Sequence, residues 1–535
     1  MKLQNHPVRN FAPGSAERNA IKSEIERQRA SSLDVGPIVG GEERMRGDGI
    51  AMREPHSHDR VLGRYHPASA TDARDAVAAA MSARPAWAAT TLGDRMKIFM
   101  RAADLLAGPF NSRLVAATML CQSKTAYQAE IDASCELIDF IRLNAAFAED
   151  ISRWQPASTA DEDNRMDYRP LDGFVFAASP FNFTAIAGNL VLAPALMGNP
   201  VVWLPSERSV HSSAILMQLF REAGVPPGVI NFLPTDRPAE VAREILGDEN
   251  LAGVHFTGST GTFDSIWRAI GGNISHYRSY PRIVGETGGK DFVLAHPSAD
   301  VVALVTGLVR GAFDYQGQKC SAASRAYIPR SIWPQVRDEL VSTADSLGIG
   351  EVSDLANFMG AVIDERSYRN IVEKLSVADT PGHEILTSRG PDDSEGWFVP
   401  PTIVECTDPL SPLMREEIFG PVLAVYVYPD EKIEETVDLV DRSTAYALTG
   451  AIFAEDRAAI DDLSDRLRDA AGNFYVNDKP TGAIVGRQPF GGGRRSGTND
   501  KAGSPYNLLR WTSPRTVKTN LDRVRDHRYE HMAAS

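Results

Sequence analysis

The sequence predicts an α/β protein in which helices cover parallel β-sheets on both faces. The first observation behind this prediction is that short apolar segments alternate with longer helical segments between residues 173 and 284, which is typical of strands buried on both sides. The second is that the alternation resumes after Gly289, which indicates a further α/β domain. The third is the length of 535 residues, which exceeds one compact core and favours two or three domains.

The first third of the chain is predicted to be mostly helical. Residues 1–45 are polar and charged, with a helical pattern over 16–29, so we expect an N-terminal helical arm. Further helical patterns follow at 70–89, 94–106 and 125–148. Residues 152–169 are rich in Pro, Asp and Ser and end in a strand-like stretch, which predicts an exposed hairpin.

Strands and helices alternate strictly in the middle of the chain. The expected strands are 173–178, 201–204, 229–232, 253–256 and 282–284. The expected helices are 184–197, 210–223, 239–246 and 259–271, followed in the second domain by 301–313 and 333–346. The stretch 173–206 has no charged residue and is long enough to cross a bilayer, but its prolines, glycines and asparagines favour a buried strand–loop–helix–strand unit.

Composition excludes several classes of function. The formal net charge of −14 argues against a nucleic-acid surface as the main partner, and the first residues lack the apolar region of a secretory signal. Cys121, Cys135, Cys320 and Cys406 lie far apart, without a Cys-x-x-Cys pair or a histidine cluster. We therefore expect no metal, no disulfide framework and no membrane partner, and a reducing intracellular compartment, either the cytoplasm or the mitochondrial matrix of a eukaryote.

Cys320 is the first candidate for chemistry. An isolated cysteine is most often an inert buried residue, but Cys320 lies in the polar, glycine-containing segment 315–321, directly after an apolar helical segment. This context predicts an accessible thiol in a loop, beside the cation of Lys319, which favours the thiolate.

Two polar residues follow predicted strands at the carboxyl edge of the first sheet, where the sites of α/β proteins form. Glu286 is surrounded by glycines, and a carboxylate there can accept a proton from water or a thiol. Asn182 lies between a strand and a helix, and its amide can donate to a developing oxyanion. The alternative interpretations are a capping or solvated glutamate and an ordinary turn asparagine.

Further candidates concern a cofactor. Gly258 and Ser259 lie at a strand-to-helix junction, where main-chain N–H groups bind phosphate. Because the G-x-G-x-x-G pattern is missing, an ordinary N-cap serine is an equal alternative. Phe419, between Glu417 and a Gly-Pro pair, can stack on a planar ring, although a phenylalanine in the core is the commoner case.

Together and in this order, these segments resemble the aldehyde dehydrogenase superfamily. The segments that carry the resemblance are 180–182, 201–207, 256–259, 286–289, 317–320, 417–421 and 489–492. Within the superfamily, the chain is most similar to the enzymes that oxidise L-glutamate γ-semialdehyde. The segments that carry this finer resemblance are 129–133, 136–140, 179–189, 472–479, 481–486, 496–503 and 509–515.

The resemblance implies an aldehyde dehydrogenase-like α/β fold with a Rossmann-type NAD-binding domain, an α/β catalytic domain and a small β flap for oligomerisation. The implied divisions are an N-terminal arm at 1–45, a dinucleotide-binding domain at 46–150 and 172–286, a catalytic thiol domain at 287–477, and a flap at 151–171 and 505–520. Family members associate through such a flap, so a homodimer or a higher homo-oligomer is implied.

The resemblance also implies roles for individual residues. Cys320 attacks the aldehyde, Asn182 and the Cys320 main-chain N–H hold the oxyanion of the thiohemiacetal, and Glu286 activates the water that hydrolyses the thioester. NAD accepts the hydride, with NADP as the alternative cofactor. The residues implied in cofactor binding are Leu204, Ser206, Glu207, Gly258, Ser259, Glu417 and Phe419.

The implied substrate is L-glutamate γ-semialdehyde, which is in equilibrium with cyclic pyrroline-5-carboxylate, and the implied product is L-glutamate, as in the last step of proline catabolism. Ser321 and the main-chain N–H groups of Gly482 and Ala483 are implied to hold the α-carboxylate. The implied contacts to the rest of the substrate are Phe183 and Phe490 along the aliphatic chain and Glu136 at the ammonium group.

One position departs from the family. Members usually carry a lysine at the position of Leu204, and that lysine contacts the adenosine ribose. Its loss would weaken NAD binding by roughly 1–3 kcal/mol, so a specialised relative that oxidises another carboxylated semialdehyde is a second hypothesis. A non-catalytic relative and a thiol hydrolase that pairs Cys320 with a histidine complete the set of hypotheses.

Overall fold

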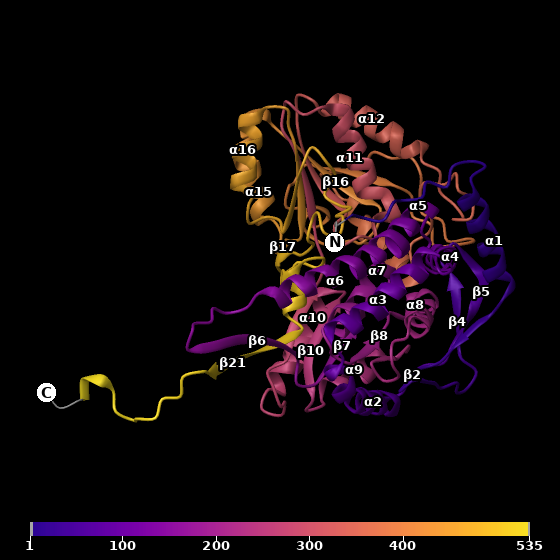
Figure 1. The fold of residues 1–535 in the computed structure, drawn as a ribbon. Helices are drawn as coiled ribbons and strands as arrows, with labels where there is room; N and C mark the ends of the chain where they lie inside the picture. Colours follow the sequence, from indigo (N-terminus) through magenta and orange to yellow (C-terminus); the bar gives the residue numbers. More distant parts are fainter. Residues whose placement is uncertain (1–3, 533–535) are drawn as a thin grey trace.

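The structure, a computed structural model that describes residues 4–532, has two halves, each built on a seven-stranded sheet (Figure 1). The first sheet has the strand order β11-β10-β7-β8-β9-β2-β3. These strands are β11 (Arg282–Glu286), β10 (Leu251–Thr257), β7 (Phe174–Ala178), β8 (Val201–Leu204), β9 (Ile230–Phe232), β2 (Ile38–Val39) and β3 (Glu42–Glu43). The five strands from β11 to β9 run parallel, so their carboxyl ends meet at one edge.

Helices cover both faces of the first sheet, as predicted. One face packs against α3 (Leu92–Ala107), α6 (Leu137–Arg153), α7 (Thr184–Leu196) and α8 (Val210–Ala223), and the other against α2 (Ala70–Ala89), α9 (Pro238–Leu246) and α10 (Thr260–Gly272). The stretch without charges becomes β7, α7 and β8, because apolar strands flanked on both faces are sealed from water. Among the described residues, no helix has the length and apolar character needed to span a bilayer.

The second sheet has the strand order β14-β15-β16-β13-β12-β18-β19. These strands are β14 (His383–Ile385), β15 (Thr402–Cys406), β16 (Val422–Tyr428), β13 (Ala323–Pro329), β12 (Asp291–Ala295), β18 (Thr449–Phe453) and β19 (Asn473–Val476). The helices α11 (Val301–Phe313) and α12 (Trp333–Ser346) pack on one face, and α13 (Glu365–Leu375), α15 (Ile433–Arg442) and α16 (Arg457–Arg466) on the other. The chain passes from the first sheet to the second between β11 and β12.

The N-terminal segment differs from a purely helical arm. Its helix α1 (Ala16–Ala30) matches the predicted segment, but β1 (Leu33–Val35), β2 and β3 follow it. Ile38 is buried and pairs with Phe232 of β9, so β2 and β3 extend the first sheet by two antiparallel strands. A hairpin of β4 (Ile50–Glu54) and β5 (Ser57–Tyr65), which the sequence did not indicate, pairs with β1.

The long helical segment predicted for 125–148 is not a regular α-helix. It consists of α5 (Ala126–Ala129), the π-helix η1 (Glu130–Glu136) and α6. A π-turn adds residues to a helical turn and changes the direction of the side chains, so Asp132 and Glu136 are directed differently from an α-helical pattern. A further helix before it, α4 (Asn111–Gln122), is almost wholly buried and lacks the two-sided pattern that reveals a helix in a sequence.

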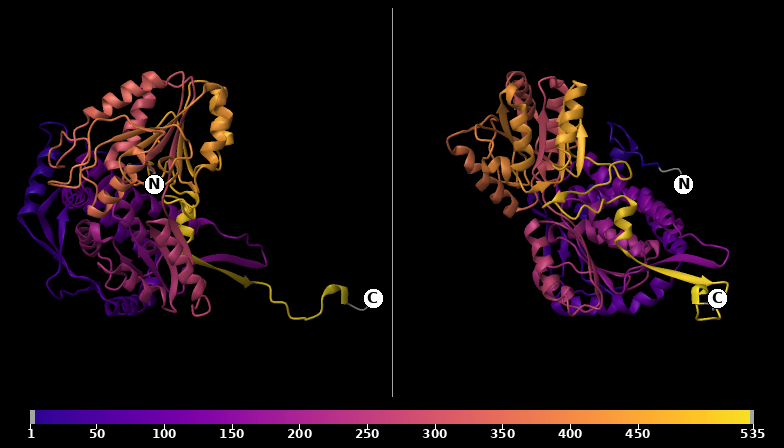
Figure 2. Two further views of the ribbon diagram at one scale, coloured as in Figure 1. Left: turned by 180° about the vertical axis from the view of Figure 1, so that it is seen from behind. Right: turned by 90° about the vertical axis from the view of Figure 1, so that its left-hand side faces the viewer.

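A two-stranded flap projects from the body (Figure 2). Its strands, β6 (Glu162–Pro170) and β21 (Thr512–Asn520), are antiparallel and pair residue by residue from Pro170–Thr512 to Glu162–Asn520. The remaining elements are η2 (Glu207–Ser209), η3 (Asp314–Gly317), η4 (Ser376–Asp379), α14 (Pro412–Arg415), η5 (Asp430–Lys432), β17 (Tyr446–Ala447), β20 (Gly493–Arg494), α17 (Pro505–Leu509) and η6 (Glu530–Met532).

Candidate active site

A cavity of about 1060 Å³ is lined by residues from both halves of the molecule. It contains Cys320 from the second half and Glu286 from the end of β11 in the first half. The predicted substrate residues that line the same cavity are Ser321, Gly482, Ala483, Phe183, Phe490 and Glu136. The structure therefore gathers around one space residues that are separated by more than 300 positions in the sequence.

The loop that carries Cys320 is held in an unusual backbone conformation. Tyr315, Gln316 and Gly317 have φ values of 52°, 56° and 65°, in the left-handed region that non-glycine residues rarely adopt. A Cβ atom on Gly317 would overlap the main-chain oxygen of Gly420. The buried Gln316 side chain donates to the carbonyl oxygens of Ser123 (3.0 Å) and Ala361 (2.6 Å), which fixes the loop from outside.

The electrostatics around the thiol differ from the prediction. Burial raises the pKa of Cys320, and the carboxyl groups of Asp291, Glu417 and Glu286 raise it further. The expectation that Lys319 favours the thiolate is wrong, because its ammonium group faces Asp314 at 3.7 Å and does not offset these carboxyl groups.

Asn182 lies beside the loop that carries Cys320. It is buried in the turn between β7 and α7, and its Nδ2 donates to the carbonyl oxygen of Gln318 at 3.0 Å. Since an amide nitrogen carries two N–H groups, one can hold this contact while the other is available to an oxyanion on a carbon attached to Cys320.

Glu286 lies in a cage made by glycines. Its Oε2 accepts a hydrogen bond from the Gly492 N–H at 3.1 Å, and a Cβ on Gly491 or Gly497 would come within 3.1 Å of its carboxylate oxygens. Burial raises the pKa of Glu286 well above the usual range of a glutamate, whereas the nearby Lys501 lowers it. A carboxylate with a raised pKa is a stronger base than an ordinary glutamate.

The candidate cofactor residues lie at the carboxyl edge of the first sheet. Leu204 ends β8 and is buried, and Ser206 and the half-buried Glu207 follow it directly. Ser259 caps α10 by accepting a hydrogen bond from the Thr262 N–H at 3.2 Å. A Cβ on Gly261, in the first turn of α10, would meet nothing within 4 Å, so an anion has open access to the main chain at this helix N-terminus.

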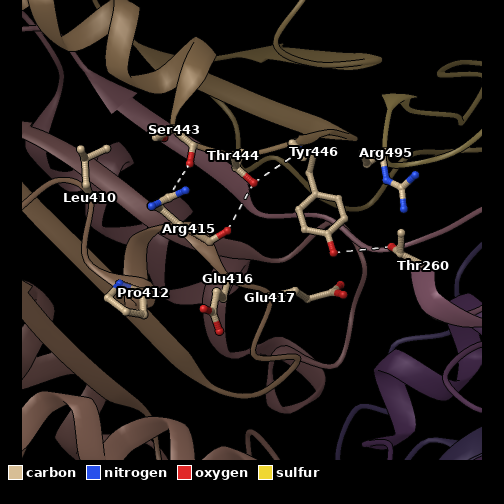
Figure 3. Close-up of a pocket in the computed structure, with 11 residues that line it drawn as sticks. Thr260, Leu410, Pro412, Arg415, Glu416, Glu417, Ser443, Thr444, Tyr446 and Arg495 are labelled. Carbon is tan, nitrogen blue, oxygen red and sulfur yellow. Dashed lines mark hydrogen bonds between the residues drawn. The ribbon is translucent and has the colours of Figure 1, made fainter.

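Glu417 faces the start of α10 across a second cavity of about 550 Å³, which both Glu417 and Thr260 line (Figure 3). Glu417 Oε1 accepts from the Gly289 N–H at 3.1 Å, and a Cβ on Gly288 would overlap its carboxylate. Burial raises the pKa of Glu417 to about 7. Phe419, with a φ of 58°, packs edge-on against Phe181 with 5.9 Å between ring centroids, which links the Glu417 loop to the Asn182 turn.

The part of the large cavity predicted to bind substrate combines hydroxyl, main-chain, acidic and aromatic groups. Ser321 Oγ is hydrogen-bonded to Thr481 Oγ1 at 2.8 Å, and Gly482, which has a φ of 90°, is exposed. Burial raises the pKa of Glu136 to about 8, with Asp132 as the next contributor. The aromatic rings of Phe183 and Phe490, which come from different parts of the chain, add apolar surface to the same cavity.

The sequence did not reveal several residues that line this cavity. Lys479 and Arg487 add positive charge within the loop that carries Gly482 and Ala483. The N-terminal residues 4–8 and 10–13 also line it: Asn5 donates to Asp139 Oδ2 and to the Val485 carbonyl oxygen, both at 2.8 Å. These contacts join positions up to 480 residues apart, and no periodic pattern in a polar segment indicates them.

Known proteins are similar to this chain in sequence and in fold. Residues 43–517 match the model of the aldehyde dehydrogenase family. The crystal structure of the delta-pyrroline-5-carboxylate dehydrogenase from Mycobacterium tuberculosis bound with NAD is 53% identical, with a TM-score of 0.95, and the match covers 99% of this chain and 98% of that one. The human mitochondrial delta-1-pyrroline-5-carboxylate dehydrogenase is 45% identical over 99% of this chain and 95% of its own length.

More distant relatives keep the same fold. The 1-pyrroline-5-carboxylate dehydrogenase from Thermus with bound NAD is 29% identical, with a TM-score of 0.90, over 97% of this chain and 99% of that one.

Proposed function

The chain belongs to the aldehyde dehydrogenase family, and from this premise we propose that it oxidises L-glutamate γ-semialdehyde, the open form of pyrroline-5-carboxylate, to L-glutamate with NAD. Relatives named for this activity are 45–53% identical over nearly the whole chain. The reaction ends the breakdown of proline to glutamate.

One observation of this chain carries the substrate assignment: the cavity at Cys320 presents complementary groups for a zwitterion. Ser321, with the Gly482 and Ala483 main chain and Lys479 nearby, suits a carboxylate. Glu136, from the π-helix η1, suits an ammonium group. A simple aliphatic aldehyde has no use for either charge, whereas an amino-acid semialdehyde satisfies both.

In the first chemical step, the Cys320 thiolate adds to the aldehyde carbon and forms a thiohemiacetal. The negative charge that develops on the former carbonyl oxygen is held by the Asn182 amide and the Cys320 main-chain N–H. The raised pKa of the thiol means that its proton must leave when the aldehyde binds, and the Glu286 carboxylate is the acceptor that lines the same cavity.

In the last step, water hydrolyses the thioester on Cys320. Glu286, once it has released the thiol proton to solvent, takes a proton from this water, the new C–O bond forms, and the C–S bond breaks to return the thiolate. The Gly492 N–H holds the Glu286 carboxylate in place, and its raised pKa makes it basic enough to accept this proton.

The residues at the sheet edge fit NAD. Open access at the start of α10, next to Ser259 and Gly258, suits a diphosphate, and the glycine gap at Gly288 leaves room for the Glu417 carboxylate to approach a ribose. Bound NAD supplies the hydride acceptor that converts the thiohemiacetal to the thioester. Glu207 and Ser206 would meet the adenosine ribose, and an acidic Glu207 disfavours the extra phosphate of NADP.

We propose further that the chain forms homo-oligomers through the flap, within segments 151–171 and 505–520. The strands β6 and β21 project from the body (Figure 1). Within the described residues each pairs only with the other, and a two-stranded ribbon is only marginally stable alone in water. Light scattering after size-exclusion chromatography tests this proposal. A dimer or larger species that becomes monomeric when 512–520 are deleted supports it, and a monomeric intact chain overturns it.

Steady-state kinetics with pyrroline-5-carboxylate tests the catalytic proposal. The expected result is NADH formation with this substrate, a KM lower than those for succinate semialdehyde and propanal, and a kcat/KM higher with NAD than with NADP. Equal kcat/KM values for propanal and the amino-acid semialdehyde would overturn the substrate assignment. Absence of NADH formation with every aldehyde would overturn the dehydrogenase itself.

A further inference from the structure

Behind the large cavity, a buried ion pair joins the loop after α4 to the π-helix η1. The Nζ of Lys124 lies 2.6 Å from Oδ2 of Asp132, and both side chains are 1% exposed. Burial lowers the pKa of Lys124, and Asp132 opposes that shift. Removing two charges from water costs free energy, so the contribution of this pair to the stability of the fold does not by itself explain its presence.

Asp132 caps a helix that begins elsewhere in the chain. Its Oδ2 accepts from the Thr184 N–H at 3.0 Å, and its Oδ1 accepts from the Ala185 N–H at 2.8 Å. These are the first two N–H groups of α7, whose own N-cap residue, Phe183, has no polar side-chain atom. The carboxylate therefore fixes the position of the main chain that immediately follows Asn182 and Phe183.

The ammonium group of Lys124 contacts two aromatic rings, one beside Asn182 and one at the start of the loop that leads to Cys320. Its Nζ lies 4.0 Å from the ring centroid of Phe183 and 4.4 Å from that of Tyr315, within the range of cation–π attraction. Phe183 follows Asn182, whereas Tyr315 begins the strained loop that leads to Cys320. The two rings also pack edge to face, with 6.4 Å between their centroids.

The direction of the π-helix explains why the pair can form. Within η1, Asp132 is directed towards the start of α7, while Glu136 lines the cavity. Within the described part of the chain, neither Lys124 nor Asp132 is among the residues that line the cavity. Any effect of the pair on the cavity must therefore pass through other residues.

We propose that Lys124 and Asp132 are positioning residues that set the distance between the Asn182 amide and the Cys320 loop. Asp132 sets the Asn182 side through α7, and Lys124 clamps that side to the nucleophile loop through Phe183 and Tyr315. The relevance of this distance to aldehyde oxidation rests on the proposed function. The effect on acyl transfer to Cys320 does not, because it requires only the thiol and its oxyanion donors.

The test is hydrolysis of p-nitrophenyl acetate without cofactor. The Cys320 thiolate attacks the acetyl carbon, p-nitrophenolate leaves with the bonding electrons, and water hydrolyses the resulting thioester to acetate. We expect Lys124→Met to lower the ester kcat by about 10- to 100-fold, since small misplacements of a catalytic group have effects of this size. The affinity for NAD, measured by calorimetry, should stay within about twofold, because the pair lies away from the cofactor edge.

A double-mutant cycle with Asn182→Ala separates positioning from general damage. If Lys124 acts through Asn182, adding Lys124→Met to Asn182→Ala costs less than about twofold more. Multiplicative losses, or a wild-type ester rate in Lys124→Met, would overturn the proposal. A wild-type chain that hydrolyses the ester but does not oxidise the semialdehyde would sink the proposed function and leave this test intact.

Arg44→Met is the matched control. Arg44 lies 2.8 Å from the buried Asp72, which completes the capping box of α2, and neither residue lines either cavity. We expect its ester kcat to stay within about twofold of the wild-type value. If Lys124→Met fails to fold, Tyr315→Leu, which keeps the ion pair but removes one of its two aromatic contacts, enters the same cycle, and its outcomes are read in the same way.

Discussion

The proposed catalytic centre (Asn182, Glu286 and Cys320) and the proposed cofactor edge (204–207) both include residues at the carboxyl ends of strands of the first sheet, yet they are held in place differently. The centre is held by the main chain: Asn182 contacts the Gln318 carbonyl, Glu286 contacts the Gly492 N–H, and Gly317 admits no side chain. The cofactor edge near Leu204 relies on side chains such as the half-buried Glu207. A centre fixed by main-chain contacts tolerates little change, whereas an edge built from side chains can lose one contact and keep the rest. The expected effects of substitutions should therefore fall from the centre outwards.

The largest effect is expected at Cys320. In the proposed mechanism, Cys320 Sγ is the atom that bonds covalently to the aldehyde carbon, so Cys320→Ala should lower kcat by at least about 10⁴-fold and leave the NAD affinity unchanged. Stopped-flow measurement of NADH formation, with calorimetry for NAD, checks both parts. Cys406→Ala, in the core of the second half, is the control and should leave kcat unaltered. A residual rate within a hundredfold of wild type would contradict a covalent mechanism.

The sequence predicted one site from Asn182, Glu286 and Cys320, and the structure places Glu286 and Cys320 at one cavity with Asn182 beside the Cys320 loop. Asn182, Glu286 and Cys320 follow strands or helices with strong apolar patterns, and the glycines and prolines beside them mark the turns. Buried parallel strands give the same kind of pattern, which is why the alternation from β7 to β11 was predicted within a few residues. Local pattern and local structure agree wherever packing is regular.

What the sequence did not predict depends on contacts across the chain. Asn5 meets Val485, and Asp132 meets Ala185, but nothing local to either residue indicates its partner. The raised pKa of Cys320 comes from burial and from carboxyl groups at 286, 291 and 417. The sequence around Cys320 shows only the neighbouring cation of Lys319, which predicts a shift in the opposite direction. The strands β2 and β3 are too short to carry a period-two pattern.

The second effect is expected at Glu286, which in the proposed mechanism activates the water of the last step. Glu286→Gln should leave a burst of one NADH per active site and slow steady-state turnover by about 10²- to 10⁴-fold. Because burial raises the Glu286 pKa well above its usual range, the carboxylate fraction grows with pH. The wild-type turnover should therefore rise with pH through that pKa, and the glutamine variant should lose the rise. A missing burst would make the first step the one that depends most on Glu286.

The third effect lies further out, at Glu136. Its pKa of about 8 means that it is mostly neutral at pH 7 and mostly ionised at pH 9. Since only the carboxylate pairs with an ammonium group, inhibition by L-glutamate should strengthen as pH rises through 8. Glu136→Gln should remove this dependence and weaken the inhibition by about tenfold at pH 9. An unchanged pH profile in the variant would place the ammonium group elsewhere in the cavity.

The smallest effect is expected at the cofactor edge, where Leu204→Lys would restore the cation that the family usually carries. Leu204 ends β8 in the buried cluster with Val202 and Phe176, so a lysine must keep its stem there and extend its ammonium group past the strand end. The gain should be about 1 kcal/mol, or roughly fivefold in the KM for NAD, because the contact lies beside solvent. Leu204→Met, which keeps the stem without the charge, is the control and should not change that KM. If lysine raises the KM or leaves it unaltered, a cation at position 204 makes no favourable contact with the cofactor in this chain. The cofactor edge would then tolerate substitution as little as the catalytic centre does.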